Sequence, residues 1–127
     1  MLSIGVANLI HSFGTDQQRQ RFLAPLEAGR FFGTMCLSEP HAGSSVGDVR
    51  TSARLMPDGR YELRGAKMWI SGCEHEMSEN IIHTVLARIE GAAAGSKGLS
   101  LFIVPRFHLT ANGNTDRAQP NGVELAS

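Results

Sequence analysis

The hydrophobic pattern changes its period once along this chain, and that change most limits the folds that the chain can adopt. Apolar residues stand three and four positions apart over residues 2–13, which is the spacing of an amphipathic helix. Thr15 and Gln18 predict a capping box at the start of a second helix, because each side chain can bond the other residue's amide. Pro25 has no N–H to donate, so we expect this helix to end or kink near Ala24.

From Gly33 onward the apolar residues fall in short runs that are β-branched, aromatic or alternating. These runs predict strands over residues 34–38, 49–56, 60–65, 66–71, 81–90 and 98–105. The sequence PDG at 57–59 predicts a hairpin turn, whereas residues 90–98 and 110–122 have the composition of loops. Two α-helices followed by six or seven antiparallel strands are typical of a small, mainly β domain, either a barrel or a sandwich.

The overall composition excludes some classes of partner. The chain has 12 Lys and Arg against 12 Asp and Glu, so bulk charge does not favour nucleic acid or an anionic membrane. Its apolar runs fall far short of the roughly 20 residues that cross a bilayer. Cys36 and Cys73 are too far apart for a CxxC motif, so we expect reduced thiols in a cytoplasmic protein. The first helix lacks a cap and the closing NGVELAS resembles an unpartnered strand, so we expect a piece of a longer polypeptide.

A polar, turn-forming stretch follows the first strand-like run. It reads MCLSEPHAGSSVGDVR, at residues 35–50. Backbone N–H groups and hydroxyls at the end of a strand can bind an anion or the polar edge of a planar ring. Gly43 would let the backbone approach such a ligand closely. An ordinary polar turn explains the same composition.

The single Trp of the chain stands in a second strand-like run, KMWISG at residues 67–72. In a strand, Trp69 and Ser71 point to the same face. That face would offer a flat aromatic surface beside a hydroxyl, which suits a flat heteroaromatic ligand. A core tryptophan next to a surface serine explains the pattern as well.

Other catalytic motifs are missing from the sequence. Glu74, His75, Glu76, His41 and His83 match neither HExxH nor a standard zinc spacing, so we expect no metal site. The serines and glycines of the polar stretch form neither a G-x-S-x-G elbow nor a P-loop.

Taken together, MCLSEPHAGSS and KMWISG resemble the middle domain of the flavin-dependent acyl-CoA dehydrogenases. That family carries a Leu-Thr/Ser-Glu-Pro-x-x-Gly-Ser signature and then Trp-Ile-Thr/Ser on a neighbouring strand. The flanks are also similar, so the resemblance covers residues 5–109. It implies that residues 1–30 end the N-terminal helical domain and that 31–127 form the middle β-barrel, which binds flavin and acyl-CoA. The chain would then be a C-terminally truncated fragment of a three-domain fold.

The family's reaction, part of fatty acid β-oxidation, is the α,β-dehydrogenation of fatty acyl-CoA thioesters. A carboxylate removes the α-proton, the β-hydrogen leaves as hydride to FAD, and an electron-transferring flavoprotein takes the electrons. That carboxylate is usually a Glu of the C-terminal domain, which no stretch here matches. We therefore assign no catalytic residue and expect this fragment alone to be inactive. The resemblance also implies that the full-length protein forms a homo-oligomer.

The resemblance implies a flavin site built from both motifs. The cofactor-binding residues would be Met35, Cys36, Leu37, Ser38, Gly43, Ser44, Trp69, Ile70 and Ser71. The Leu37 and Ser38 amides, with the Ser38 hydroxyl, would donate to the pyrimidine edge of the flavin. Trp69 would pack against the isoalloxazine, with the Ser71 hydroxyl near N5. Ser44 would also contact acyl-CoA.

Two positions depart from the commoner family pattern. Ser45 stands where most members have Asp, and Ser71 stands where many have Thr. The HAGSS form of the first motif, together with the stretch GCEHEMSENIIH, is similar to a broad-specificity bacterial branch of the family. Two other functions stay open: a flavin oxidase or monooxygenase on the same scaffold, and a non-catalytic β-barrel binding module.

Overall fold

The computed structural model describes residues 2–36, 39, 50–65, 67, 78–93 and 95–122. The chain divides into two compact units. The first contains Met1–Met35, Ser71–Thr84 and Ile103–Ser127, and the second contains Cys36–Ile70 and Val85–Phe102. Across the described ranges, none of the helices is long and apolar enough to cross a membrane.

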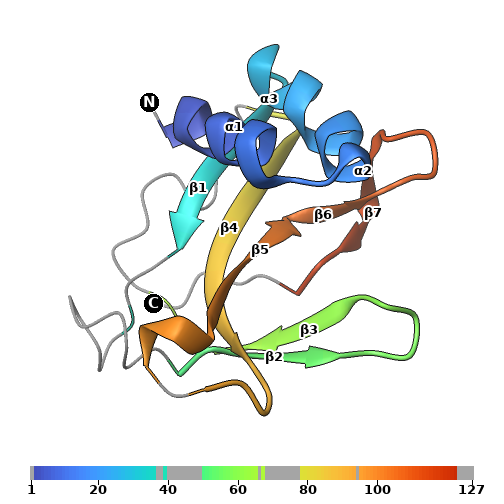
Figure 1. The fold of residues 1–127 in the computed structure, drawn as a ribbon. Helices are drawn as coiled ribbons and strands as arrows, with labels where there is room; N and C mark the ends of the chain where they lie inside the picture. Colours follow the sequence, from blue (N-terminus) through green and yellow to red (C-terminus); the bar gives the residue numbers. More distant parts are fainter. Residues whose placement is uncertain are drawn as a thin grey trace. The chain divides into compact units, whose positions relative to one another are not determined.

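The first unit begins with four helical segments, drawn in blue in Figure 1. They are α1 (Leu2–Phe13), α2 (Asp16–Gln18), the π-helix η1 (Arg19–Leu23) and α3 (Ala24–Glu27). The predicted capping box is confirmed, since the Thr15 amide donates to Gln18 Oε1 at 2.9 Å and the Gln18 amide donates to Thr15 Oγ1 at 3.1 Å.

The chain does not leave the helical conformation near Ala24. Pro25 lies in the first turn of α3, which follows η1 directly, so the helical backbone continues past the residue that has no N–H to donate. The wider turn of η1 precedes it. The helix ends at Gly29, which has a φ of 77°. There the amide of Arg30 donates to the carbonyl of Pro25 at 2.9 Å, and the amide of Gly29 donates to the carbonyl of Leu26 at 3.2 Å. This pair of bonds forms a Schellman motif.

The core of the first unit lies between these helices and two strands, β1 (Phe31–Cys36) and β4 (Asn80–Ile89). Its buried members are Val6, Ala7, Ile10, Phe22, Leu26, Phe31 and Ile82. Val6 and Ile10, which helical spacing places on the expected amphipathic face, are buried together with Ala7, whereas Phe13, expected on the same face, is 84% exposed.

The first unit also contains a hairpin that the sequence analysis missed. Residues 110–122 were expected to form a loop, but β7 (Thr115–Pro120) pairs antiparallel with β6 (Phe107–Leu109), as Figure 1 shows in orange and red. The turn closes through Gly113, which has a φ of 83°. The guanidinium of Arg117 lies 5.1 Å from the Phe107 ring centroid. Pairing with β6 decides the conformation of this polar segment, whereas its composition indicates only the turn.

In the second unit, β2 (Ser52–Leu55) and β3 (Tyr61–Arg64) form the predicted hairpin. The PDG turn is confirmed: the Met56 amide donates to the Arg60 carbonyl at 2.8 Å, and Gly59 has a φ of 86°. A Gly in this conformation as the last residue of a three-residue loop is a common way to close a hairpin. The unit also holds the short 3₁₀ helix η3 (Ser96–Gly98).

The strand order is β1-β4-β2-β3, and β5 (Leu99–Pro105) pairs with β4. The prediction of a mainly β chain preceded by helices is confirmed. The expectation that every pair is antiparallel is wrong, because β2 and β4 are parallel, with Ser52 opposite Arg88 and Ala53 opposite Ile89. Parallel neighbours require a long connection, and here residues 56–79, which include β3, connect β2 to β4.

Candidate functional site

The carboxylate of Glu39 is the centre of a buried polar cluster in the second unit. It accepts hydrogen bonds from the Arg50 amide at 2.6 Å, from the Thr51 amide at 3.0 Å and from the Thr51 hydroxyl. The ammonium of Lys67 lies 2.6 Å away and forms an ion pair with it. The Glu39 side chain is 1% exposed and that of Lys67 is 9% exposed. We call these four residues the Glu39 clamp.

Glu39 is ionised at neutral pH. Burial would raise the pKa of this carboxyl, but the Lys67 ammonium, the Thr51 hydroxyl and the amides of Arg50 and Thr51 together lower it to about 2. A group with so low a pKa is a poor proton acceptor at neutral pH. Glu39 is therefore suited to holding chain segments together and not to removing a substrate proton.

The clamp is built into the sheet through Thr51. The Thr51 carbonyl accepts from the amide of Arg88, on β4, at 2.8 Å. On the other side, Gly65 packs so closely that a Cβ there would lie 2.8 Å from the Thr51 Cα. Thr51 thus has a fixed backbone on which the Glu39 carboxylate is anchored.

Replacing Gly65 by Ala should destabilise the protein, because the added Cβ would meet backbone, which cannot rotate away as a flexible side chain can. We expect urea denaturation to report a loss of about 1–2 kcal/mol in the free energy of unfolding, as for other overpacked sites. Gly5→Ala in α1 is the matched control, since nothing lies within 4 Å of its Cβ position and Ala favours a helix. Equal losses in both variants would contradict this account.

Of the residues expected to bind a cofactor, the structure describes two, both at the end of β1. Met35 packs against the core of the first unit, and its Sδ lies 2.9 Å from the Thr84 hydroxyl. Cys36 is buried, with 7% exposure. The other expected residues lie outside the described residues: Leu37, Ser38, Gly43, Ser44, Trp69, Ile70 and Ser71.

A buried polar pair joins β1 to β4 in the first unit. The Thr34 hydroxyl and His83 Nδ1 are 2.6 Å apart, and the Thr84 hydroxyl donates to the Thr34 carbonyl at 2.7 Å. Burial, together with the positive charge of Arg106, lowers the pKa of His83 to about 4. His83 is therefore neutral at neutral pH. In the part of the chain that the structure describes, no three His, Cys, Asp or Glu side chains are grouped to hold a metal ion.

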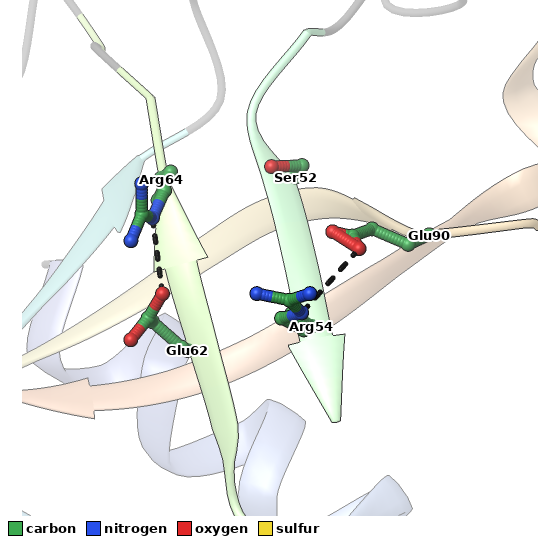
Figure 2. A pocket seen from close by; sticks show the side chains of 5 residues that line it. All are labelled: Ser52, Arg54, Glu62, Arg64 and Glu90. Atoms are coloured by element: carbon green, nitrogen blue, oxygen red, sulfur yellow. Dashed lines mark hydrogen bonds and ion pairs between the residues drawn. The ribbon is translucent and has the colours of Figure 1, made fainter. Parts of the chain in front are cut away.

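Figure 2 shows a shallow hollow of about 180 Å³ on the second unit. Its lining residues are Ser52, Arg54, Glu62, Arg64 and Glu90. Arg64 Nε lies 3.0 Å from Glu62 Oε1, and Arg54 Nε lies 3.8 Å from Glu90 Oε1. Each guanidinium already has a carboxylate beside it, so the hollow carries no excess charge with which to attract an ionic ligand.

The sequence motif contains Glu39 but does not indicate its side-chain partners, Thr51 and Lys67. The signal was weak because Lys67 stands 28 positions from Glu39 and no local pattern links them. An acid inside a strand-to-turn stretch and a Lys shortly before the only Trp were the available signs.

Comparison with known proteins agrees with this fold. The family model "Acyl-CoA dehydrogenase, middle domain" matches residues 34–123. A 3-methylmercaptopropionyl-CoA dehydrogenase of Ruegeria pomeroyi is 41% identical over 122 residues, covering 96% of this chain and 21% of that protein. The broad-specificity linear acyl-CoA dehydrogenase FadE5 of Mycobacterium tuberculosis is 48% identical over 105 residues, covering 81% of this chain and 17% of that protein.

A solved structure gives the same result. The glutaryl-CoA dehydrogenase of Mycobacterium smegmatis in complex with FADH2 matches with a TM-score of 0.63 and 29% identity, covering 79% of this chain and 23% of that one. The chain spans about a fifth of the length of the two curated relatives. The family model begins within β1 and includes all four residues of the Glu39 clamp. The resemblance of the two motifs is thereby confirmed, and the chain belongs to the acyl-CoA dehydrogenase family.

Proposed function

We propose that this chain forms the flavin-contacting middle domain of an FAD-dependent acyl-CoA dehydrogenase, which introduces a double bond between the α- and β-carbons of a fatty acyl-CoA thioester. The Glu39 clamp is the observation that carries this proposal. Glu39 directly follows Leu37 and Ser38 in the sequence, and Lys67 stands two residues before Trp69. The ion pair between Glu39 and Lys67 therefore joins the chain at both motif stretches.

The residues at these stretches fit a flavin. Amide and hydroxyl donors at Leu37 and Ser38 suit the pyrimidine edge, which gains negative charge on reduction, so donors there raise the electron affinity of the ring. Trp69 offers an aromatic surface for the isoalloxazine, and Ser71 a hydroxyl near N5. The remaining proposed contacts are Met35, Cys36, Gly43, Ser44 and Ile70, and Ser44 would also contact acyl-CoA. Bound FAD would supply the hydride acceptor.

The proton acceptor would lie elsewhere in the protein. Glu39 has a pKa of about 2 and is held by the clamp, which argues against its acting as the base. We therefore propose residues 1–30 as the end of a helical domain, residues 31–127 as the middle domain, and a Glu of a further domain as the base. The proposed setting is a cytoplasmic homo-oligomer that passes electrons to an electron-transferring flavoprotein.

The test is an anaerobic titration of the full-length protein that carries this chain with acyl-CoA thioesters of increasing chain length, followed by the visible absorption of the flavin. We expect rapid bleaching by at least one thioester, because reduction of the flavin removes its visible band. A yellow protein that no thioester bleaches would indicate another flavin chemistry, such as an oxidase or monooxygenase. A colourless protein that takes up no added FAD would favour a binding module instead.

A further inference from the structure

The Glu39 clamp joins three separate positions of the chain. The amides of Arg50 and Thr51 bond both oxygens of the Glu39 carboxylate, at 2.6 Å and 3.0 Å, and so tie residue 39 to residues 50 and 51. Lys67 is distant from these residues in the sequence, yet its ammonium reaches the same carboxylate at 2.6 Å. The clamp therefore also holds the chain at Lys67.

Burial restricts the geometry of the contact between Lys67 and Glu39. With exposed fractions of 1% and 9%, both charged groups have given up most of their water. A desolvated ion pair stabilises a protein little more than a well-packed apolar pair in the same place would. Removing one partner, however, leaves a buried charge whose desolvation is no longer compensated. Such a pair tolerates few alternative geometries, so it holds its two chain segments in one arrangement.

The other ion pairs of the second unit differ in this respect. Arg64 and Glu62 are 77% and 42% exposed, and Arg54 and Glu90 are 66% and 55% exposed. Exposed pairs of this kind contribute little and constrain little. Among the ion pairs of the described residues, the one between Glu39 and Lys67 is buried on both sides and links two stretches that carry the proposed flavin contacts.

We propose that Glu39 and Lys67 are positioning residues for the flavin: their buried ion pair sets the spacing between the pyrimidine-edge donors that precede Glu39 and the aromatic wall that follows Lys67. This inference rests on the proposed function, since it assumes that both stretches contact FAD. Neither side chain needs to touch the cofactor. Their role is to hold two contacting segments at the separation that one isoalloxazine ring spans.

The test measures FAD affinity and the visible circular dichroism of the bound flavin in the full-length protein. Glu39→Gln keeps the side-chain shape but removes the charge, and we expect it to weaken FAD binding by about tenfold or more and to change the flavin dichroism. Lys67→Arg keeps the charge and should retain most of the affinity. Glu39→Asp, which draws the charge back by one methylene, should show a smaller loss in the same direction and serves if Glu39→Gln does not fold.

Leu26→Ala is the matched control for a purely structural effect. Leu26 is 4% exposed in the core of the first unit, so this variant should lower the melting temperature and leave the FAD dissociation constant within about twofold. If Glu39→Gln and Leu26→Ala change melting temperature and FAD affinity in the same proportion, Glu39 is only a structural residue and the inference is wrong. A wild-type protein that binds no FAD would instead overturn the proposed function, and this inference with it.

Discussion

Replacing Lys67 by Met should lower the free energy of unfolding by about 3–5 kcal/mol, the usual cost of breaking a buried ion pair by removing one partner. Methionine fills a similar volume but leaves the Glu39 carboxylate, which is 1% exposed, without its counter-ion. The amides of Arg50 and Thr51 would remain bonded to it and would offset only part of the loss. Urea denaturation of the full-length protein at neutral pH measures the change.

Two further variants separate charge from volume. Glu39→Gln combined with Lys67→Met removes both charges and should regain part of the lost stability, since replacing a whole buried pair is often close to neutral, but the Gln N–H₂ cannot accept from a backbone amide as the second carboxylate oxygen does. Arg64→Met removes a cation whose pair with Glu62 is exposed, and should cost less than about 1 kcal/mol. A double variant as unstable as Lys67→Met would show that methionine fits the site poorly and that charge is not the cause.

The features that depend on neighbouring residues could be read from the sequence. The capping box joins Thr15 to Gln18 within one turn, and the PDG hairpin joins Met56 to Arg60 across three residues. In both, the side chains or the turn residues determine the geometry locally, with no help from tertiary contacts. The burial of Val6 and Ile10 in α1 followed for the same reason, because helical spacing fixes which residues share a face, but spacing did not show that Phe13 stays exposed.

Features that depend on distant residues could not be read in this way. Thr115–Pro120 is polar and follows turn residues, so its composition indicates a loop, yet Phe107–Leu109 supplies hydrogen-bonding partners that make it a strand. The parallel pairing of β2 with β4 and the ion pair between Glu39 and Lys67 likewise join residues dozens of positions apart. Periodicity carries no information on which segments become neighbours.

The candidate site was predictable in another way. From composition alone, the polar stretch at 35–50 could be an ordinary turn and the run at 67–72 could be part of the core. Either stretch could equally form part of a ligand site. Only the likeness of both stretches to one family linked them, and the match of residues 34–123 to the middle-domain model confirms that family. The clamp adds a physical link between the two stretches that the motifs alone did not contain.

Lowering the pH should destabilise the protein through His83. This side chain is 2% exposed, and its pKa of about 4 lies below the ordinary histidine value of 6.5. Between these two values the unfolded chain binds a proton that the folded chain does not, so stability is retained above about pH 6.5 and falls as the pH drops toward about 4. The difference amounts to about 3 kcal/mol between about pH 7 and about pH 4.

The variant His83→Gln isolates this effect. Glutamine can still bond the Thr34 hydroxyl, which lies 2.6 Å from His83 Nδ1, but it does not titrate. We therefore expect unfolding free energies measured at about pH 7 and about pH 4 to differ by about 3 kcal/mol less in this variant than in the wild type. Other acid-sensitive groups, Glu39 among them, act in both proteins and cancel in the comparison. If His83→Gln and the wild type lost equal stability on acidification, the buried neutral state assigned to His83 would be wrong.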